Sequence, residues 1–144
     1  MLIQPYVFFD GPCEEAIAFY REALDAQLLA QMRFSDSPEP GAACPGQDAP
    51  PPQDKIMHAM VQIGETQVMM SDGFAAGKPE FRGISLSLSV ADDAEAKRRF
   101  DALAVGGQVV QALEPTFFSS SFGMVNDRFG VSWMVVGPML QPPG

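Results

Sequence analysis

The segment 84–90 has the clearest pattern of hydrophobic and polar positions in the chain. It reads ISLSLSV, so that four apolar residues alternate with three serines, Ser85, Ser87 and Ser89. Because successive side chains of a strand point to opposite faces, this alternation predicts a strand with one buried face. Apolar runs bounded by Gly, Pro, Asn or Asp predict seven further strands, over residues 2–9, 28–34, 55–63, 66–71, 109–113, 122–126 and 131–136.

Two helices are predicted between these strands. The first begins near Pro12, and its apolar stripe consists of Cys13, Ile17, Tyr20 and Leu24. The second begins at Asp92 with a capping-box sequence, and its apolar stripe consists of Ala96, Phe100 and Leu103. Residues 38–54 contain six prolines and almost no large apolar side chain, so we expect a long, mobile loop, either a lid or an insertion.

The element order βαβββ occurs twice, which predicts an internal duplication. The sequence FYREALDAQLLAQM at 19–32 is echoed by RFDALAVGGQVVQAL at 99–113, an offset of about 80 residues. One helix cannot cover both faces of a sheet, so two such modules are expected to pair. The expected fold is therefore a single α+β domain over 1–144. Its modules, at about 1–74 and 83–137, are expected to form a curved mixed sheet around a pocket, with the helices outside.

Composition and charge narrow the class of protein. The chain has 144 residues, of which 47% are hydrophobic and 19% charged, which is typical of a globular domain with its own core. No apolar run approaches the ~20 residues of a membrane span, and the first residues lack the basic start of a signal peptide. The net charge of −9 disfavours binding to nucleic acid or to an anionic membrane. We therefore expect a cytoplasmic protein whose partner is a small molecule.

Three segments together resemble a known family. They are PYVFFDGPCEEAIAFYREAL at 5–24, HAMVQIGETQVMMSDG at 58–73 and FGMVNDRFGVSWMV at 122–135. In order and spacing they are similar to the PhnB-like branch of the vicinal-oxygen-chelate superfamily, over residues 3–136. That superfamily includes glyoxalase I, bleomycin- and fosfomycin-resistance proteins and extradiol dioxygenases. The resemblance implies the paired βαβββ fold but does not by itself imply a reaction, because this fold supports several.

The resemblance also implies four positions that hold a divalent metal in the enzymes of the superfamily, normally with His and Glu. In this sequence they fall at Gln4 or Pro5, Met69, Ser85 and Met134. None of these residues is His, Asp or Glu, and a thioether is too soft a ligand for hard cations. We therefore predict no metal ion at these positions and no other cofactor. A displaced site that uses His58 remains an alternative.

His58 is the only histidine of the chain. If Gly64 and Glu65 form a two-residue turn, His58 lies opposite Ser71, and one face of the two strands carries His58, Met60, Gln62, Gln67, Met69 and Ser71. This is the expected pocket face, to which the second module contributes Ser85, Ser87 and Met134. His58 is either a ligand-binding or general-base histidine, or a structural one that hydrogen-bonds Ser71 or Asp72.

The remaining candidates have simpler interpretations beside functional ones. The serines of 84–90 either bind a ligand or form an ordinary polar strand face, and the methionines either line a pocket or pack in the core. Trp133 and Cys13 are expected in the core, Cys44 in the loop, and residues 126–130 in a turn. No catalytic thiol is expected.

Three functions remain open. The first is a metal-free binder of a small molecule, similar to the bleomycin-resistance proteins. The second is a lyase, isomerase or dioxygenase that uses a displaced metal or His58, and the third is a structural dimer without a ligand. The branch often carries a demethylubiquinone methyltransferase description, but no glycine-rich nucleotide loop follows a strand here, so methyl transfer is not expected. A homodimer is expected, with modest support from Tyr6, Phe8 and Phe9.

Overall fold

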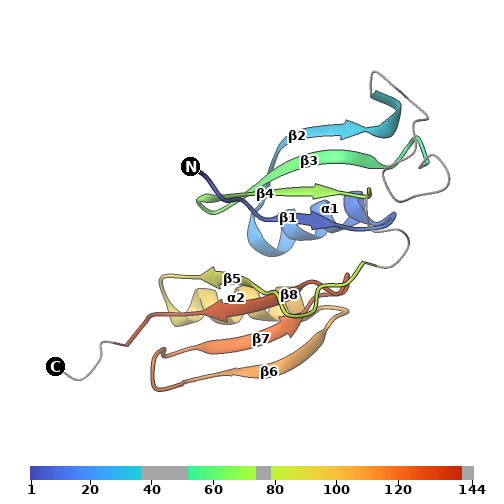
Figure 1. Cartoon of the computed structure of the whole chain (residues 1–144). Helices are drawn as coiled ribbons and strands as arrows, with labels where there is room; N and C mark the ends of the chain where they lie inside the picture. Colours follow the sequence, from blue (N-terminus) through green and yellow to red (C-terminus); the bar gives the residue numbers. More distant parts are fainter. Residues whose placement is uncertain (37–51, 74–78, 141–144) are drawn as a thin grey trace. The chain divides into compact units, whose positions relative to one another are not determined.

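The computed structural model describes residues 1–36, 52–73 and 79–140 of the chain. The chain divides into two compact units, Met1–Glu80 and Phe81–Gly144. In the first unit the elements are β1 (Tyr6–Phe8), α1 (Cys13–Leu24), β2 (Gln27–Arg33), the short 3₁₀ helix η1 (Phe34–Asp36), β3 (Ile56–Ile63) and β4 (Thr66–Ser71). In the second they are β5 (Leu86–Ser89), α2 (Asp93–Ala104), β6 (Gln108–Glu114), β7 (Phe122–Asn126) and β8 (Ser132–Val136) (Figure 1).

Each unit contains one four-stranded mixed sheet, and the two sheets have equivalent strand orders. The order is β1-β4-β3-β2 in the first and β5-β8-β7-β6 in the second. In both, the first strand pairs parallel with the last and the other pairs are antiparallel. The helices begin at Cys13 and Asp93, at the predicted offset of about 80 residues. The α+β class and the repeated βαβββ order are thus confirmed, whereas the arrangement around a pocket stays a prediction.

In each unit the helix contacts the strands of its own sheet. The side chains that α1 buries include Cys13, Ile17, Tyr20 and Leu24, and those that α2 buries are Ala96, Phe100 and Leu103. Both sets match the apolar stripes expected from the sequence. The opposite face of each sheet is only partly buried, and the exposed side chains of the candidate site lie there.

A carboxylate from the end of β4 caps α1. Pro12 precedes the helix and offers no side-chain cap. Instead, Oδ1 of the buried Asp72 accepts hydrogen bonds from the backbone N–H groups of Gly11 at 2.7 Å and Cys13 at 3.0 Å. Its Oδ2 accepts the N–H of Ile56 at 3.2 Å, at the start of β3. One side chain therefore ties together three backbone segments that are far apart in the sequence.

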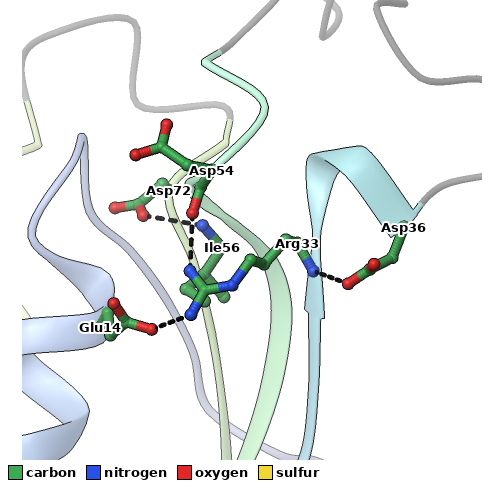
Figure 2. A network of polar contacts seen from close by, with 6 residues as sticks. All are labelled: Glu14, Arg33, Asp36, Asp54, Ile56 and Asp72. Carbon is green, nitrogen blue, oxygen red and sulfur yellow. Dashed lines mark hydrogen bonds and ion pairs between the residues drawn. The ribbon is translucent and has the colours of Figure 1, made fainter.

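Arg33 extends this polar network at the end of β2, as Figure 2 shows. Its guanidinium group pairs with Glu14 of α1 and donates to the carbonyl of Asp54 at 2.6 Å. Its backbone N–H donates to Asp36 Oδ2 at 2.9 Å. These contacts hold the end of β2 beside α1 and the segment that enters β3.

The second unit caps its helix differently. The side chain of Asp92 accepts the N–H of Glu95 at 2.7 Å, as the capping-box sequence predicts. Asp93 accepts hydrogen bonds from the hydroxyl groups of Ser120 and Ser121, and these bonds lower the pKa of the Asp93 carboxyl. The two units therefore share a topology but not the side chains that fix the start of the helix.

Two strands are shorter, by three residues or more, than the sequence predicted. The predicted strand at 2–9 is reduced to Tyr6–Phe8, and that at 84–90 to Leu86–Ser89. The strand β5 is shorter because of its partner β8, which begins only at Ser132. The first pair in their parallel register is Leu86 with Trp133. Ile84 therefore lies outside the strand and is 74% exposed, which contradicts its expected place on the buried face.

Of the loop predicted at 38–54, residues 38–51 lie outside the described residues, so its expected mobility stays a prediction. Within the described parts of the chain, no helix has both the length and the apolar character that a membrane span requires.

Candidate functional site

The partly buried face of the first sheet carries most of the side chains singled out in the sequence. The predicted turn is present, with Ile63 opposite Thr66, Gln62 opposite Gln67 and Met60 opposite Met69. We call this surface the open face and define it by the side chains that alternation places there: Tyr6, Phe8, Met32, His58, Met60, Gln62, Gln67, Met69 and Ser71. The opposite face carries the core residues Ala59, Val61, Val68 and Met70.

Tyr6 is the functional candidate that sequence reasoning missed. It enters the open face because β1 pairs parallel with β4, which places Tyr6 beside Met69. Its hydroxyl group hydrogen-bonds Nδ1 of His58 at 2.8 Å, and the two rings are tilted at a centroid distance of 5.6 Å. The expected structural partners of His58 were Ser71 and Asp72. Asp72 instead accepts backbone N–H groups, and the Ser71 hydroxyl accepts the backbone N–H of Gly73 at 2.8 Å.

The Tyr6 ring is held in a fixed position. It stacks on Phe8 with a centroid distance of 4.5 Å and an interplanar angle of 7°. Burial raises the pKa of the Tyr6 phenol, the nearby Cys13 also raises it, and a hydrogen bond to Ser71 acts in the opposite direction. The phenol therefore keeps its proton at neutral pH. Because Tyr6 remains 37% exposed, the Tyr6–His58 pair is accessible at the surface of this unit.

The glutamines of the open face are engaged in hydrogen bonds near the turn. Gln4 donates from Nε2 to Oε1 of Gln67 at 3.2 Å, and Gln62 donates to the carbonyl of Gly64 at 3.1 Å. On the other side of His58, Met32 of β2 lies opposite it in the register. The open face thus combines aromatic rings, thioethers and neutral amides around one imidazole.

The second unit contributes the other residues expected at the site. Ser85 hydrogen-bonds Ser132 through their hydroxyl groups at 2.7 Å, so it is engaged within its own sheet. Ser87 lies beside Met134 in the parallel register, and Met134 lies opposite Met124 of β7. Ser87 is exposed and Met134 half-buried. These residues share the partly buried face of their own sheet, equivalent to the open face of the first.

The donor atoms at the four family metal positions do not fit a divalent cation. Met69 lies between Met60 and Tyr6, and its backbone N–H donates to the carbonyl of Pro5 at 3.0 Å. The two thioethers and the Ser85 hydroxyl carry no negative charge with which to replace the water around such an ion. In residues 1–36, 52–73 and 79–140, no three side chains of His, Cys, Asp or Glu come together as a metal-binding group.

Other predicted roles in the core are confirmed. Trp133 is buried and donates from Nε1 to Oδ2 of Asp127 at 2.9 Å. The Asp127 carboxylate also accepts the backbone N–H groups of Phe129 and Val131, which fixes the predicted turn between β7 and β8.

Cys13 is expected to be unreactive in the folded protein. It is fully buried, and burial raises the pKa of its thiol strongly, with further contributions from the negative charges of Asp72 and Glu14. In a Cys44→Ser variant, a thiol-reactive aromatic disulfide should label no thiol under native conditions and one thiol in denaturant. Rapid labelling of the native variant would contradict the buried position of Cys13.

Comparisons with known proteins place the whole chain in one family. A family model described as 3-demethylubiquinone-9 3-methyltransferase matches residues 2–136. The protein YjdN of Escherichia coli is 38% identical over an alignment of 146 residues, which covers 99% of each chain. The crystal structure of PA1353 from Pseudomonas aeruginosa is 45% identical, with a TM-score of 0.77 over 95% of this chain and 97% of that one.

Two further structures connect this family with a wider fold. A PhnB protein from Bacillus cereus, described as a putative 3-demethylubiquinone-9 3-methyltransferase, is 25% identical with a TM-score of 0.77, over 96% of this chain and 100% of that one. The fosfomycin resistance protein FosX from Listeria monocytogenes is 8% identical and shares the fold. Its TM-score is 0.64 over 97% of this chain and 94% of that one. The chain therefore belongs to the family described as 3-demethylubiquinone-9 3-methyltransferase, is similar to a PhnB protein as its motifs indicate, and shares its fold with FosX.

Proposed function

We propose that this protein binds a small organic molecule at the open face of its first unit, without a divalent metal. The observation that carries the proposal is the Tyr6–His58 hydrogen bond of 2.8 Å, on an accessible face of rings and thioethers. Such a surface suits a neutral ligand with a flat apolar part, because thioethers adapt to its shape and aromatic rings stack on it.

The charge of the open face supports a neutral ligand. Its defining residues include no Lys, Arg, Asp or Glu, and its polar groups are amides, hydroxyls and one imidazole. A strongly charged ligand would lack a partner of opposite charge there, and burying an unpaired charge is costly.

Methyl transfer is not the activity that we propose, although the family description names it. In the described residues, each unit contains a mixed four-stranded sheet with one α-helix. A typical nucleotide-dependent methyltransferase uses a parallel sheet with a glycine-rich loop at the end of a strand. The fold that this chain shares with FosX is of a different kind, so the name of the family does not by itself imply methyl transfer by this chain.

Catalysis by His58 is a second candidate function. A phenol and an imidazole at hydrogen-bond distance can pass a proton to or from a bound substrate. A lyase, isomerase or dioxygenase that also used a displaced metal near His58 would belong to this alternative. The resting protein would then hold a metal ion, which can be measured directly.

Native mass spectrometry of freshly purified protein distinguishes the two functions. We expect a homodimer that carries a small organic mass and no metal. The same spectrum at higher collision energy should release the ligand and leave the polypeptide mass alone. A ligand-free monomer that takes up no small molecule from a fragment collection would contradict the proposal.

Titration calorimetry of chelator-treated protein with Zn²⁺, Ni²⁺, Mn²⁺ and Fe²⁺ provides the second test. We expect no submicromolar binding, because the available donors cannot replace the hydration of these ions. Submicromolar binding that disappears in His58→Ala would favour the enzyme alternative. Binding that survives this substitution would show that the positions assigned as metal ligands are wrong.

A further inference from the structure

The Tyr6–His58 hydrogen bond limits where the imidazole of His58 can carry its proton. The phenol oxygen of Tyr6 lies 2.8 Å from Nδ1 of His58, so one of these two atoms donates and the other accepts. Stacking of the Tyr6 ring on Phe8, at a centroid distance of 4.5 Å, supports this position of the phenol. The atom that donates decides the tautomer of the neutral imidazole.

The relative strengths of donor and acceptor set the direction of this hydrogen bond. A phenol oxygen can donate or accept, and a nitrogen of a neutral imidazole does one or the other according to whether it carries the proton. Tyr6 keeps its phenolic proton, because burial raises the pKa of its phenol. A phenol is the more acidic donor and an unprotonated imidazole nitrogen is the more basic acceptor, so Tyr6 donates to Nδ1 of His58. A ring nitrogen that accepts a hydrogen bond carries no proton, so the neutral imidazole is protonated on Nε2.

We propose that Tyr6 holds His58 as the Nε2–H tautomer, so that the open face offers a ligand one fixed hydrogen-bond donor on the imidazole. Tyr6 is then a positioning residue. Among the described residues Nε2 has no hydrogen-bond partner, which leaves this donor available. The role in recognition rests on the proposed function, and it specifies the ligand class: a neutral, flat apolar molecule with a carbonyl-type oxygen acceptor.

The tautomer can be measured without any ligand. Because His58 is the only histidine, a long-range ¹H–¹⁵N correlation spectrum of the labelled protein contains a single imidazole. At a pH at which titration shows the ring to be neutral, we expect Nδ1 in the range of an unprotonated nitrogen and Nε2 in that of a protonated one. A protonated Nδ1 in the wild-type protein would overturn the proposal, and this outcome needs no variant.

Two variants test the part played by Tyr6. Tyr6→Phe keeps the ring on Phe8 but removes the hydroxyl, so both nitrogen shifts of His58 should move toward those of a ring that exchanges between tautomers. Tyr20→Phe is the matched control, since Tyr20 is the only other tyrosine and lies buried in α1. It should leave the His58 shifts unchanged. Unchanged shifts in Tyr6→Phe would show that Tyr6 does not set the tautomer.

Acetophenone and α-methylstyrene test the ligand class, since they differ only in a carbonyl oxygen against a methylene group. Acetophenone should shift the Nε2 signal and bind up to about twofold more weakly to Tyr6→Phe, because only the fraction of molecules with the proton on Nε2 can then donate to it. α-Methylstyrene, which has no acceptor oxygen, should leave the chemical shift of Nε2 unchanged. If neither probe binds while the tautomer is as expected, the proposed function fails and the fixed tautomer stands. Equal effects of both probes would contradict the acceptor requirement.

Discussion

Asp72→Ala should lower the free energy of unfolding by about 3–5 kcal/mol. The Asp72 carboxylate accepts three backbone N–H groups, from Gly11, Cys13 and Ile56, at 2.7, 3.0 and 3.2 Å. Alanine leaves these donors without an acceptor, and each unsatisfied buried donor costs about 1–3 kcal/mol. Water that enters the space left by the carboxylate would recover part of this loss. Urea unfolding followed by circular dichroism measures the effect.

Asp36→Ala is the control for this variant. Its carboxylate accepts one backbone N–H, that of Arg33 at 2.9 Å, at an exposed position where water can replace it. We expect a loss of about 0.5–1 kcal/mol. The free energy of unfolding of Asp72→Asn should lie between those of the two alanine variants. Its amide oxygen can still accept a hydrogen bond, but its NH₂ group would face a backbone N–H donor. Equal stabilities of Asp72→Ala and Asp36→Ala would show that the Asp72 network does not hold the first unit together.

Gly107→Ala should destabilise the second unit by about 2–3 kcal/mol, within the range of overpacking substitutions. A Cβ atom at this position would lie 2.2 Å from the carbonyl oxygen of Asn126 and 2.9 Å from the carbonyl carbon of Asp127. Both neighbours are backbone atoms, so they cannot move away by a rotamer change. The pairing of Gln108 with Asn126 would have to shift, which disturbs the start of β6. Thermal unfolding of the variant should show the loss.

Gly64→Ala is the matched substitution for Gly107→Ala. Gly64 occupies the turn between β3 and β4 with a φ of +58°, and a Cβ atom there would meet nothing within 4 Å. Its cost comes from the left-handed backbone alone, about 1 kcal/mol. A larger loss in Gly64→Ala than in Gly107→Ala would contradict the close approach of Gly107 to β7.

Local patterns were sufficient to predict the elements and part of the candidate site. The alternation in β3 and β4, together with the turn at Gly64, placed His58, Met60 and Met69 on one face, because the register of a hairpin follows from its turn. The apolar stripe of α1 could be predicted from the sequence for a similar reason, since helical spacing is also a local property.

The rest depended on contacts between distant segments. Tyr6 joins His58 only because β1 pairs parallel with β4, and no local pattern specifies such a pairing. Asp72 likewise looked like an ordinary turn residue, because its three donors come from other parts of the chain. The exposed Ile84 shows that alternation predicts a face, whereas the length of the neighbouring strand decides where pairing ends.

The pairing of first and last strands has a consequence for synthesis on the ribosome. The first sheet cannot be completed until β4 has been made, and β4 ends at Ser71, immediately before the carboxylate that caps α1. All of these parts precede Phe81, the first residue of the second unit. Because chains emerge and fold from the N-terminus, the first unit has every strand and its helix cap before β5 is translated. A ribosome that pauses after the first unit has left the exit tunnel would therefore hold a nascent chain with one complete sheet.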